Sequence, residues 1–291
     1  MPTVENAIPT TSTQSRVVTL SDHVWKEREA RHKQRVAAQA EAFVKRRAHG
    51  ETHPVWDFLF TYYSFSPNKL TTWVPGILTA DEIDDMETRH WEAPPLTDRF
   101  RKEAAWIAQL CANIVSKPAR LACYGLHEWA MVYRQSAEKV RHSGYTLRLS
   151  PEELATFIES QSLCCTHFDA FRFFTAEARP LNALNPSFES RLEMEQPGCL
   201  HANMDLYKWA YKLWPWIGSD LLADAFEVAL FGRDLDMRAS PYDLAALGFE
   251  PIAIETAEGR VQYVAAQREL AIRSEPVRKA LQEAATTLAG L

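Results

Sequence analysis

The sequence has no long apolar run and lacks several motifs that identify common enzyme classes. Its apolar stretches fall well short of the roughly 20 residues that cross a bilayer, and the amino terminus has no basic segment followed by an apolar run. We therefore expect a cytoplasmic protein without a membrane partner. The patterns GxGxxG, GxxxxGKS/T, GxSxG and HExxH are absent, which argues against nucleotide-fold dehydrogenases, P-loop enzymes, α/β-hydrolases and zincins.

Cysteine usage excludes two further classes of protein. The five cysteines form an odd set without a CxxC pair, which argues against a disulfide framework and against a zinc ribbon. A reducing compartment fits this usage. The residues are Cys111, Cys123, Cys164, Cys165 and Cys199.

The composition predicts one large folded domain. Apolar residues make up 46% and charged residues 24% of the chain, which is an ordinary globular balance, and no linker divides the sequence. Residues 1–20 are rich in Thr, Ser and Pro without periodicity, so we expect a flexible arm there. Residues 21–291 are expected to form a single, mainly α domain with a few short β-strands and a C-terminal hairpin.

Apolar periodicity and capping residues locate the expected elements. The clearest local signal is Ser150-Pro151-Glu152-Glu153, which combines an N-cap serine, a first-turn proline and a capping-box glutamate. The alternating segment 163–174 favours a strand, and residues 252–256 and 260–264 around Ala257-Glu258-Gly259 predict a β-hairpin. Helices are expected from Ser21 to just before Gly50 and over 98–116, 119–136, 150–160, 199–213, 219–233 and 275–288.

Charge is distributed unevenly along the chain. The formal net charge of −6 gives no global attraction to nucleic acid, yet residues 26–47 carry a local excess of basic side chains. This segment is either a solvated helix face or a phosphate-contacting helix. The phosphate-contacting candidates are Lys26, Arg28, Arg31, Lys33 and Arg35.

Two His and Asp pairs are the main candidates for chemistry. His167 and Asp169 lie two residues apart, so on an extended segment both side chains would point to one side. His201 and Asp205 lie one turn apart on an expected helix, which suits metal binding or an oriented base. The alternatives are a satisfied buried polar pair in the first case and a solvated surface stripe in the second.

Two other groups carry weaker signals. The stretch 233–243, which holds three aspartates and two arginines around a Ser-Pro turn, is typical of a salt-bridged loop. His127-Glu128 lies among bulky aromatics, where a satisfied core histidine is the commoner arrangement.

Residues 53–244 contain the strings HPVWDFLFTYYSFSP, CCTHFDAFRFF, EQPGCLHANMDLYKWAYKL and RDLDMRASPYDL. Together these strings resemble a bacterial family of 3-methyladenine DNA glycosylases. The resemblance implies hydrolysis of the N-glycosidic bond of an alkylated purine in DNA, with no metal or organic cofactor. The nearest counterpart of the hairpin in helix-hairpin-helix glycosylases, residues 73–81, lacks the second glycine, so no catalytic residue is carried over from those enzymes.

Cleavage of this bond needs a carboxylate near the sugar, an oriented water and walls that hold a flipped base. The catalytic candidates are Asp205, His201, His167 and Asp169. The substrate-binding candidates are Phe168, Arg172, Tyr207, Lys208, Trp209, Arg238, Tyr242 and Asp243.

The same side chains also allow two other hypotheses. One is a metal-dependent enzyme acting on a small molecule, with iron, manganese or zinc held by ligands drawn from a His and carboxylate cluster. The other is a non-enzymatic protein that binds a ligand or nucleic acid. The metal-ligand candidates are His167, Asp169, Glu195, His201 and Asp205.

Overall fold

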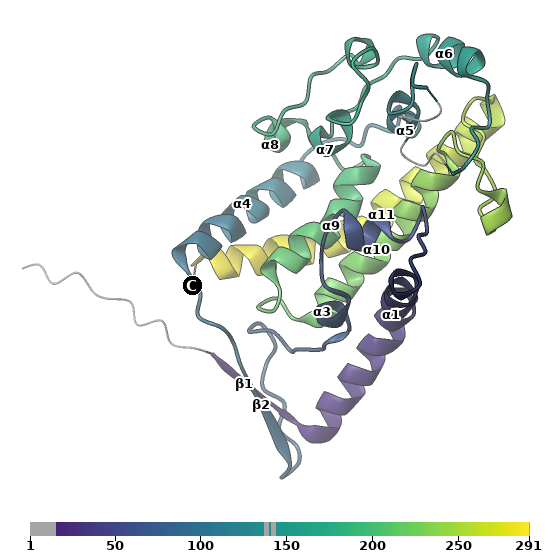
Figure 1. Cartoon of the computed structure of the whole chain (residues 1–291). Coiled ribbons are helices and arrows are strands. Elements are labelled where there is room, and N and C mark those ends of the chain that lie inside the picture. The colour runs from purple at the N-terminus through teal and green to yellow at the C-terminus, as the bar shows by residue number, and fades with distance from the viewer. Residues whose placement is uncertain (1–15, 137–139, 141–143, 291) are drawn as a thin grey trace, which may run out of the picture.

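Four helices pack together at the centre of the fold (Figure 1). The computed structural model describes residues 16–136, 140 and 144–290. Helix α11 packs against α4, α9 and α10, and α9 also packs against α10. The mainly helical domain expected from the sequence is confirmed. The four helices are α4 (Asp98–Val115), α9 (Leu200–Leu213), α10 (Ser219–Arg238) and α11 (Ala257–Gly290).

The remaining elements surround this centre. Helix α1 (Asp22–Ala48) packs against α10 and against α3 (Pro67–Thr71). Strand β1 (Val17–Ser21) pairs antiparallel with β2 (Thr88–Glu92), and the sheet lies at the opposite end of the molecule from α5, α6, α7 and α8 (Figure 1). No helix in the described ranges is both long and apolar enough to cross a membrane. The short helices are α2 (Phe58–Thr61), α5 (Leu126–Ala130), α6 (Pro151–Glu159), α7 (Phe168–Phe171) and α8 (Arg191–Met194), with 3-10 turns at Arg179–Leu181 and Ala245–Leu247.

Local sequence signals account for several helix boundaries. The capping box at the start of α6 is present: the Glu153 amide donates to Ser150 Oγ, and the Ser150 amide donates to a Glu153 carboxylate oxygen. At the start of α4, Thr97 Oγ1 accepts from the Phe100 amide at 3.2 Å. These helices were predicted because the signals lie within a few residues of the boundary they specify.

A glycine allows α9 and α10 to approach closely. A Cβ atom added at Gly232 would lie 2.5 Å from Cγ of Met204 on α9. Most of α9 is buried, including its polar residues His201, Asn203 and Asp205. The close crossing therefore places charged groups of both helices inside the core.

The expected C-terminal hairpin is wrong. Ala257, Glu258 and Gly259 form the first turn of α11 rather than the turn between two strands. Thr256 Oγ1 accepts from the Gly259 amide at 3.0 Å, which satisfies one of the free amides at the helix start. Residues 260–264 then continue the helix, which begins 18 residues before the predicted boundary at residue 275.

The strand expected over 163–174 is also wrong. His167 precedes the single helical turn α7, and Leu163 makes only an isolated bridge with Asn182. The Asn182 side chain accepts from the Cys165 amide at 2.7 Å and donates to the Cys165 carbonyl at 3.0 Å. Because a distant amide group satisfies this backbone, the segment needs no neighbouring strand.

Three other boundaries differ from expectation. The helix expected over 119–136 is reduced to α5, which follows Gly125 with a φ of +72°. The arm expected over 1–20 is wrong for residues 17–20, because β1 buries Val18 and Leu20; residues 1–15 lie outside the described part. Helix α10 continues to Arg238, so residues 233–238 are helical rather than part of a loop.

We expect Gly259→Ala to destabilise the protein, although alanine normally favours a helix by about 1 kcal/mol over glycine. The new Cβ would lie 1.9 Å from the Ala253 carbonyl oxygen, so the backbone before α11 must move. Gly290→Ala in the same helix is the control, because a Cβ there meets nothing within 4 Å. Urea unfolding should show a loss of stability only in Gly259→Ala; equal midpoints for both variants would contradict the close contact.

Candidate functional site

Two distant parts of the chain meet inside the protein, one around α7 and one in α9. His167 immediately precedes α7 and Asp169 lies in it, while His201 and Asp205 lie on α9; all four are buried. The rings of His167 and His201 stack at a centroid distance of 5.4 Å. His167 Nε2 lies 3.3 Å from Asp205 Oδ2. The structure thus brings together the four residues that the sequence singles out.

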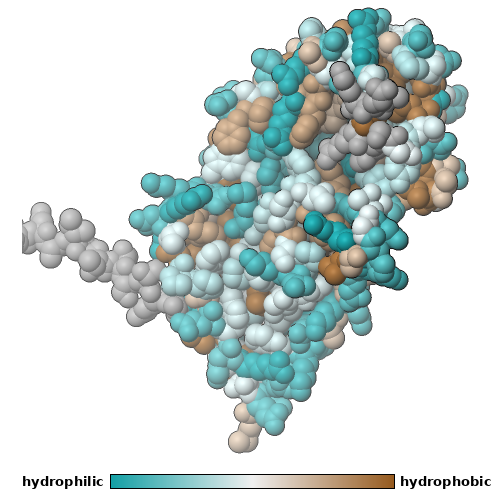
Figure 2. Space-filling model, in the orientation of Figure 1, coloured by the Kyte–Doolittle hydropathy of each residue, from teal (hydrophilic) through white to brown (hydrophobic). Residues whose placement is uncertain are grey.

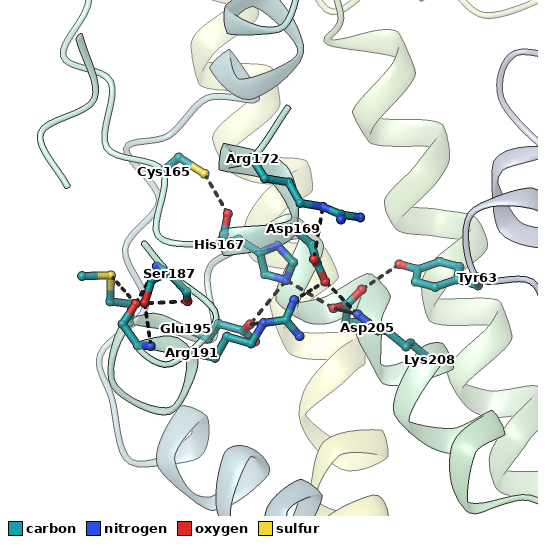
Figure 3. Close-up of polar contacts among 12 residues, drawn as sticks. Tyr63, Cys165, His167, Asp169, Arg172, Ser187, Arg191, Glu195, Asp205 and Lys208 are labelled. Carbon is teal, nitrogen blue, oxygen red and sulfur yellow. Dashed lines mark hydrogen bonds and ion pairs between the residues drawn. The ribbon is translucent and has the colours of Figure 1, made fainter. Parts of the chain in front are cut away.

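His167 faces two carboxylates (Figure 3). Its Nε2 atom lies 3.5 Å from Glu195 Oε1, close to the end of α8, and 3.3 Å from Asp205 Oδ2. Burial works against a charged imidazole, but Glu195 and Asp205 together raise the pKa of His167 above its ordinary value. Burial raises the pKa of Glu195, which is fully buried. We call His167, Glu195 and Asp205 the buried trio.

Asp169 is held by cations instead of by His167. It accepts from Arg191 Nη2 and from Lys208 Nζ, the latter at 2.7 Å, and Arg172 Nε lies 3.4 Å away (Figure 3). Burial alone would raise the pKa of Asp169, but Lys208 outweighs it and holds the pKa below its usual value. This carboxylate is committed to ion pairs, so of the five metal-ligand candidates it is the least available.

His201 belongs to a second group of ligand-type residues. Three possible ligand atoms lie within 4.8 Å of one another, one each from His127, His201 and Asp236. All three residues are buried. His127 Nε2 is 2.7 Å from Asp236 Oδ1, and the His127 and His201 rings pack at a centroid distance of 4.4 Å. Burial, together with the neighbouring His127, lowers the pKa of His201 to about 3. We call this set the His-His-Asp triad.

Arg233 fixes the carboxylate of the triad. Its Nη1 atom donates to Asp236 Oδ2 at 2.7 Å, while Nε and Nη2 donate to the carbonyl oxygens of Val55 and Pro54. The guanidinium is thereby tied to the aromatic segment that precedes α2. Asp236 keeps Oδ1 directed at His127, because Oδ2 is occupied by the arginine.

A small cavity borders the triad. Its volume is about 20 Å³, room for about one water molecule, and His127 and His201 form part of its wall. Burial raises the pKa of Cys165 to about 12, so this neighbouring thiol is uncharged at neutral pH. Four of the five cysteines also line the cavity, namely Cys123, Cys164, Cys165 and Cys199.

The remaining substrate-binding candidates separate into three groups. Arg191 lies over the ring of Phe168 and Lys208 over the ring of Trp209, so these aromatics border the cations around Asp169. Tyr207 packs edge-on against Tyr63 and at a tilt against Phe226, inside the aromatic core. The other three have partners of their own: Arg238 contacts Asp234, Tyr242 bridges to Leu147, and the Asp243 side chain accepts from the Ala245 amide.

All five phosphate-contacting candidates on α1 face carboxylates. Arg35 is paired with both Asp224 and Glu227 of α10, each at 2.6 Å, and Arg28 is paired with Glu82 at 2.7 Å. These pairs offset the positive charge that would attract a phosphate backbone. The other pairs are Lys26 with Asp22, Arg31 with Glu27 and Lys33 with Glu29.

Two residues of the triad, His127 and Asp236, carry only weak signals in the sequence. His127 was expected to be a satisfied core histidine, and Asp236 was placed in an ordinary salt-bridged loop. A usable signal was the position of Asp236 between Leu235 and Met237 in a helix that is mostly buried. A carboxylate on such a face is unusual unless it is paired or binds a metal.

No protein-family model matches this sequence, and comparisons with curated proteins and with solved structures found no match.

We expect Asp169→Asn to destabilise the protein by about 3 kcal/mol, because it leaves the buried Arg191 and the partly exposed Lys208 without their carboxylate. Arg191 is almost fully buried and Lys208 is mostly so. Glu275→Gln is the control, since its pair with Lys279 is exposed at both ends and should contribute nothing measurable. Equal urea unfolding midpoints for Asp169→Asn and wild type would show that the cations find other partners.

Proposed function

We propose that this protein is a metal-dependent enzyme whose metal ion is held by the His-His-Asp triad. The observation that carries the proposal is the convergence of three buried ligand atoms within 4.8 Å, beside a cavity with room for about one water. A metal ion with three protein ligands and one open position is the usual arrangement of a catalytic site.

The chemistry of the donor set fits first-row transition metals. Two imidazoles and one carboxylate bind iron, manganese and zinc, whereas calcium and magnesium prefer oxygen ligands alone. His127 and Asp236 already lie 2.7 Å apart, and neither ring nitrogen of His201 has a hydrogen-bond partner in the described part of the chain. Such an ion, when bound, would act as a Lewis acid or lower the pKa of a water.

The residues around the triad would position the ligands. Arg233 holds Asp236 through Oδ2, and its own place is fixed by the carbonyl oxygens of Pro54 and Val55. Such outer contacts orient a ligating carboxylate, and their loss typically lowers metal affinity by about 10–100-fold. The uncharged thiol of Cys165 and the other cavity cysteines leave the imidazoles as the strongest donors facing the cavity.

The size of the cavity favours a small-molecule substrate. About 20 Å³ holds a water or the reacting group of a small molecule, whereas base-excision chemistry needs a pocket for a whole flipped purine. The pairing of the five basic candidates on α1 also gives DNA little free positive charge there. Glycosylase activity on DNA stays a prediction from the resemblance to 3-methyladenine DNA glycosylases. Measuring base release from methylated DNA tests it.

We expect protein purified without chelator to contain iron, manganese or zinc, and Asp236→Asn to lose it, because an amide is a poor replacement for the carboxylate ligand. Asp234→Asn is the matched control: it lies on the same helix, is half-exposed and contacts Arg238 instead of the triad. Elemental analysis measures the metal in each. Should Asp236→Asn misfold, cobalt absorption bands in chelator-treated wild type report His and carboxylate ligation.

Two results would contradict the proposal. One is equal metal content in Asp236→Asn and Asp234→Asn. The other is release of 3-methyladenine from methylated DNA by protein that has been freed of metal, which would support base excision instead.

A further inference from the structure

A second, larger pocket lies between α11, the first turn of α9 and the segment that follows α4. Its volume is about 350 Å³, and it shares no wall residue with the small cavity beside the triad. Pockets that hold small molecules have volumes of about 300–1,000 Å³. One face of α11 forms a wall, since the wall residues recur every three or four positions along the helix. They are Arg268, Ala271, Ile272, Glu275 and Arg278.

Arg278 is a buried cation in the wall of this pocket. Its side chain is 2% exposed, and it forms no ion pair within the described part of the chain. Its Nη1 atom donates to the Ala202 carbonyl oxygen at 3.3 Å, and Nη2 donates to the Asn203 side-chain oxygen. Burial lowers the pKa of Arg278 more than Glu195 and the neighbouring thiols raise it. Because arginine has five N–H donors and keeps its charge, two neutral acceptors leave this guanidinium without a counter-ion.

The other charges of the wall also favour an anion. Neither Arg268, which is exposed, nor Lys117 forms an ion pair with any described residue. Lys117 Nζ donates instead to two backbone carbonyl oxygens, at 2.8 Å and 2.9 Å. Glu275 is the acidic residue of the wall, and its carboxylate is paired with Lys279. The pocket is therefore locally positive in a protein whose formal net charge is −6.

Much of the remaining wall is apolar. Val115 is 40% exposed and Ile272 is 60% exposed, and Leu121 and Ala271 lie beside them in the wall. Apolar residues are scattered among hydrophilic ones over the face of the protein in Figure 2, so exposed apolar side chains alone do not mark a site. Here they accompany a buried arginine, whose planar fork matches the geometry of carboxylates and phosphates.

We propose that this pocket binds a small organic anion. The carboxylate or phosphate group of the ligand accepts hydrogen bonds from Arg278, and its apolar part packs against Ile272 and Leu121. Arg268 and Lys117 add attraction for the negative charge. The inference goes beyond the metal site and does not depend on it, because no ligand of the triad lines the pocket.

Calorimetric titration with hexanoate and with hexyl phosphate tests the pocket and distinguishes the two head groups. Wild type should bind at least one of these anions and bind hexanol far more weakly. Arg278→Met should weaken anion binding by at least about tenfold, because it removes charge-assisted hydrogen bonds. Ala271→Trp should abolish binding by filling the pocket. Ala265→Trp is the matched control, since Ala265 is exposed on the same helix and does not line the pocket.

Three results would overturn the inference. They are wild type that binds neither anion, hexanol binding as tight as that of the anions, and anion binding that Ala271→Trp leaves unchanged. If Arg278→Met does not fold, as judged by circular dichroism, Ala271→Trp and Ala265→Trp decide alone. Chelator-treated wild type should bind the anion as tightly as untreated protein. Loss of binding on chelation would place the anion at a metal ion, which would overturn the pocket and support the metal site.

Discussion

Charged side chains lie inside the helical core of this protein, and their need for partners constrains the rest of the structure. Asp169, Glu195, Asp205 and Asp236 are all buried between α7, α8, α9 and α10. A carboxylate without a partner in such a place would take up a proton or unfold the domain around it. The arginines and the lysine that enter the core are therefore as necessary to the fold as the apolar residues around them.

The four buried carboxylates differ in how closely their partners approach. Asp169 forms ion pairs with Arg191 and Lys208. Asp236 accepts a hydrogen bond from Arg233 and lies within hydrogen-bond distance of His127. Glu195 and Asp205 instead face an imidazole at distances too long for good hydrogen bonds. Replacing a buried ion pair by apolar residues is often neutral or stabilising, so polar groups kept in this state need a reason other than stability.

Elements and candidate residues could be predicted from the sequence where the residues that determine them are close together in the chain. The capping box at Ser150 and the apolar face of α4 each depend on neighbours within one or two turns, and both were predicted. The candidate pairs around His167 and His201 were found in the same way, from spacing of two and four residues. Their meeting inside the core could be stated only as a hypothesis, because it depends on packing between α7 and α9.

The errors come from partners far away in the chain. Asn182 satisfies the backbone of Cys165, so an alternating segment does not become a strand. The hairpin is an exception, because its cap is local: Thr256 Oγ1 accepts from the Gly259 amide, and the Ala-Glu-Gly sequence that suits a hairpin turn starts α11 instead. The partners of Arg28 and Arg35 lie at Glu82, Asp224 and Glu227, so the basic segment loses the charge that its own sequence suggests. Asp236 was overlooked because its charged neighbours resemble a surface loop.

The most direct test of a metal at the triad is anomalous X-ray diffraction from crystals of chelator-free protein, recorded on both sides of the iron, manganese and zinc absorption edges. We expect an anomalous peak about 2.0–2.2 Å from ring nitrogens of His127 and His201 and from a carboxylate oxygen of Asp236. No peak there, with His127 still hydrogen-bonded directly to Asp236 Oδ1, would contradict the account.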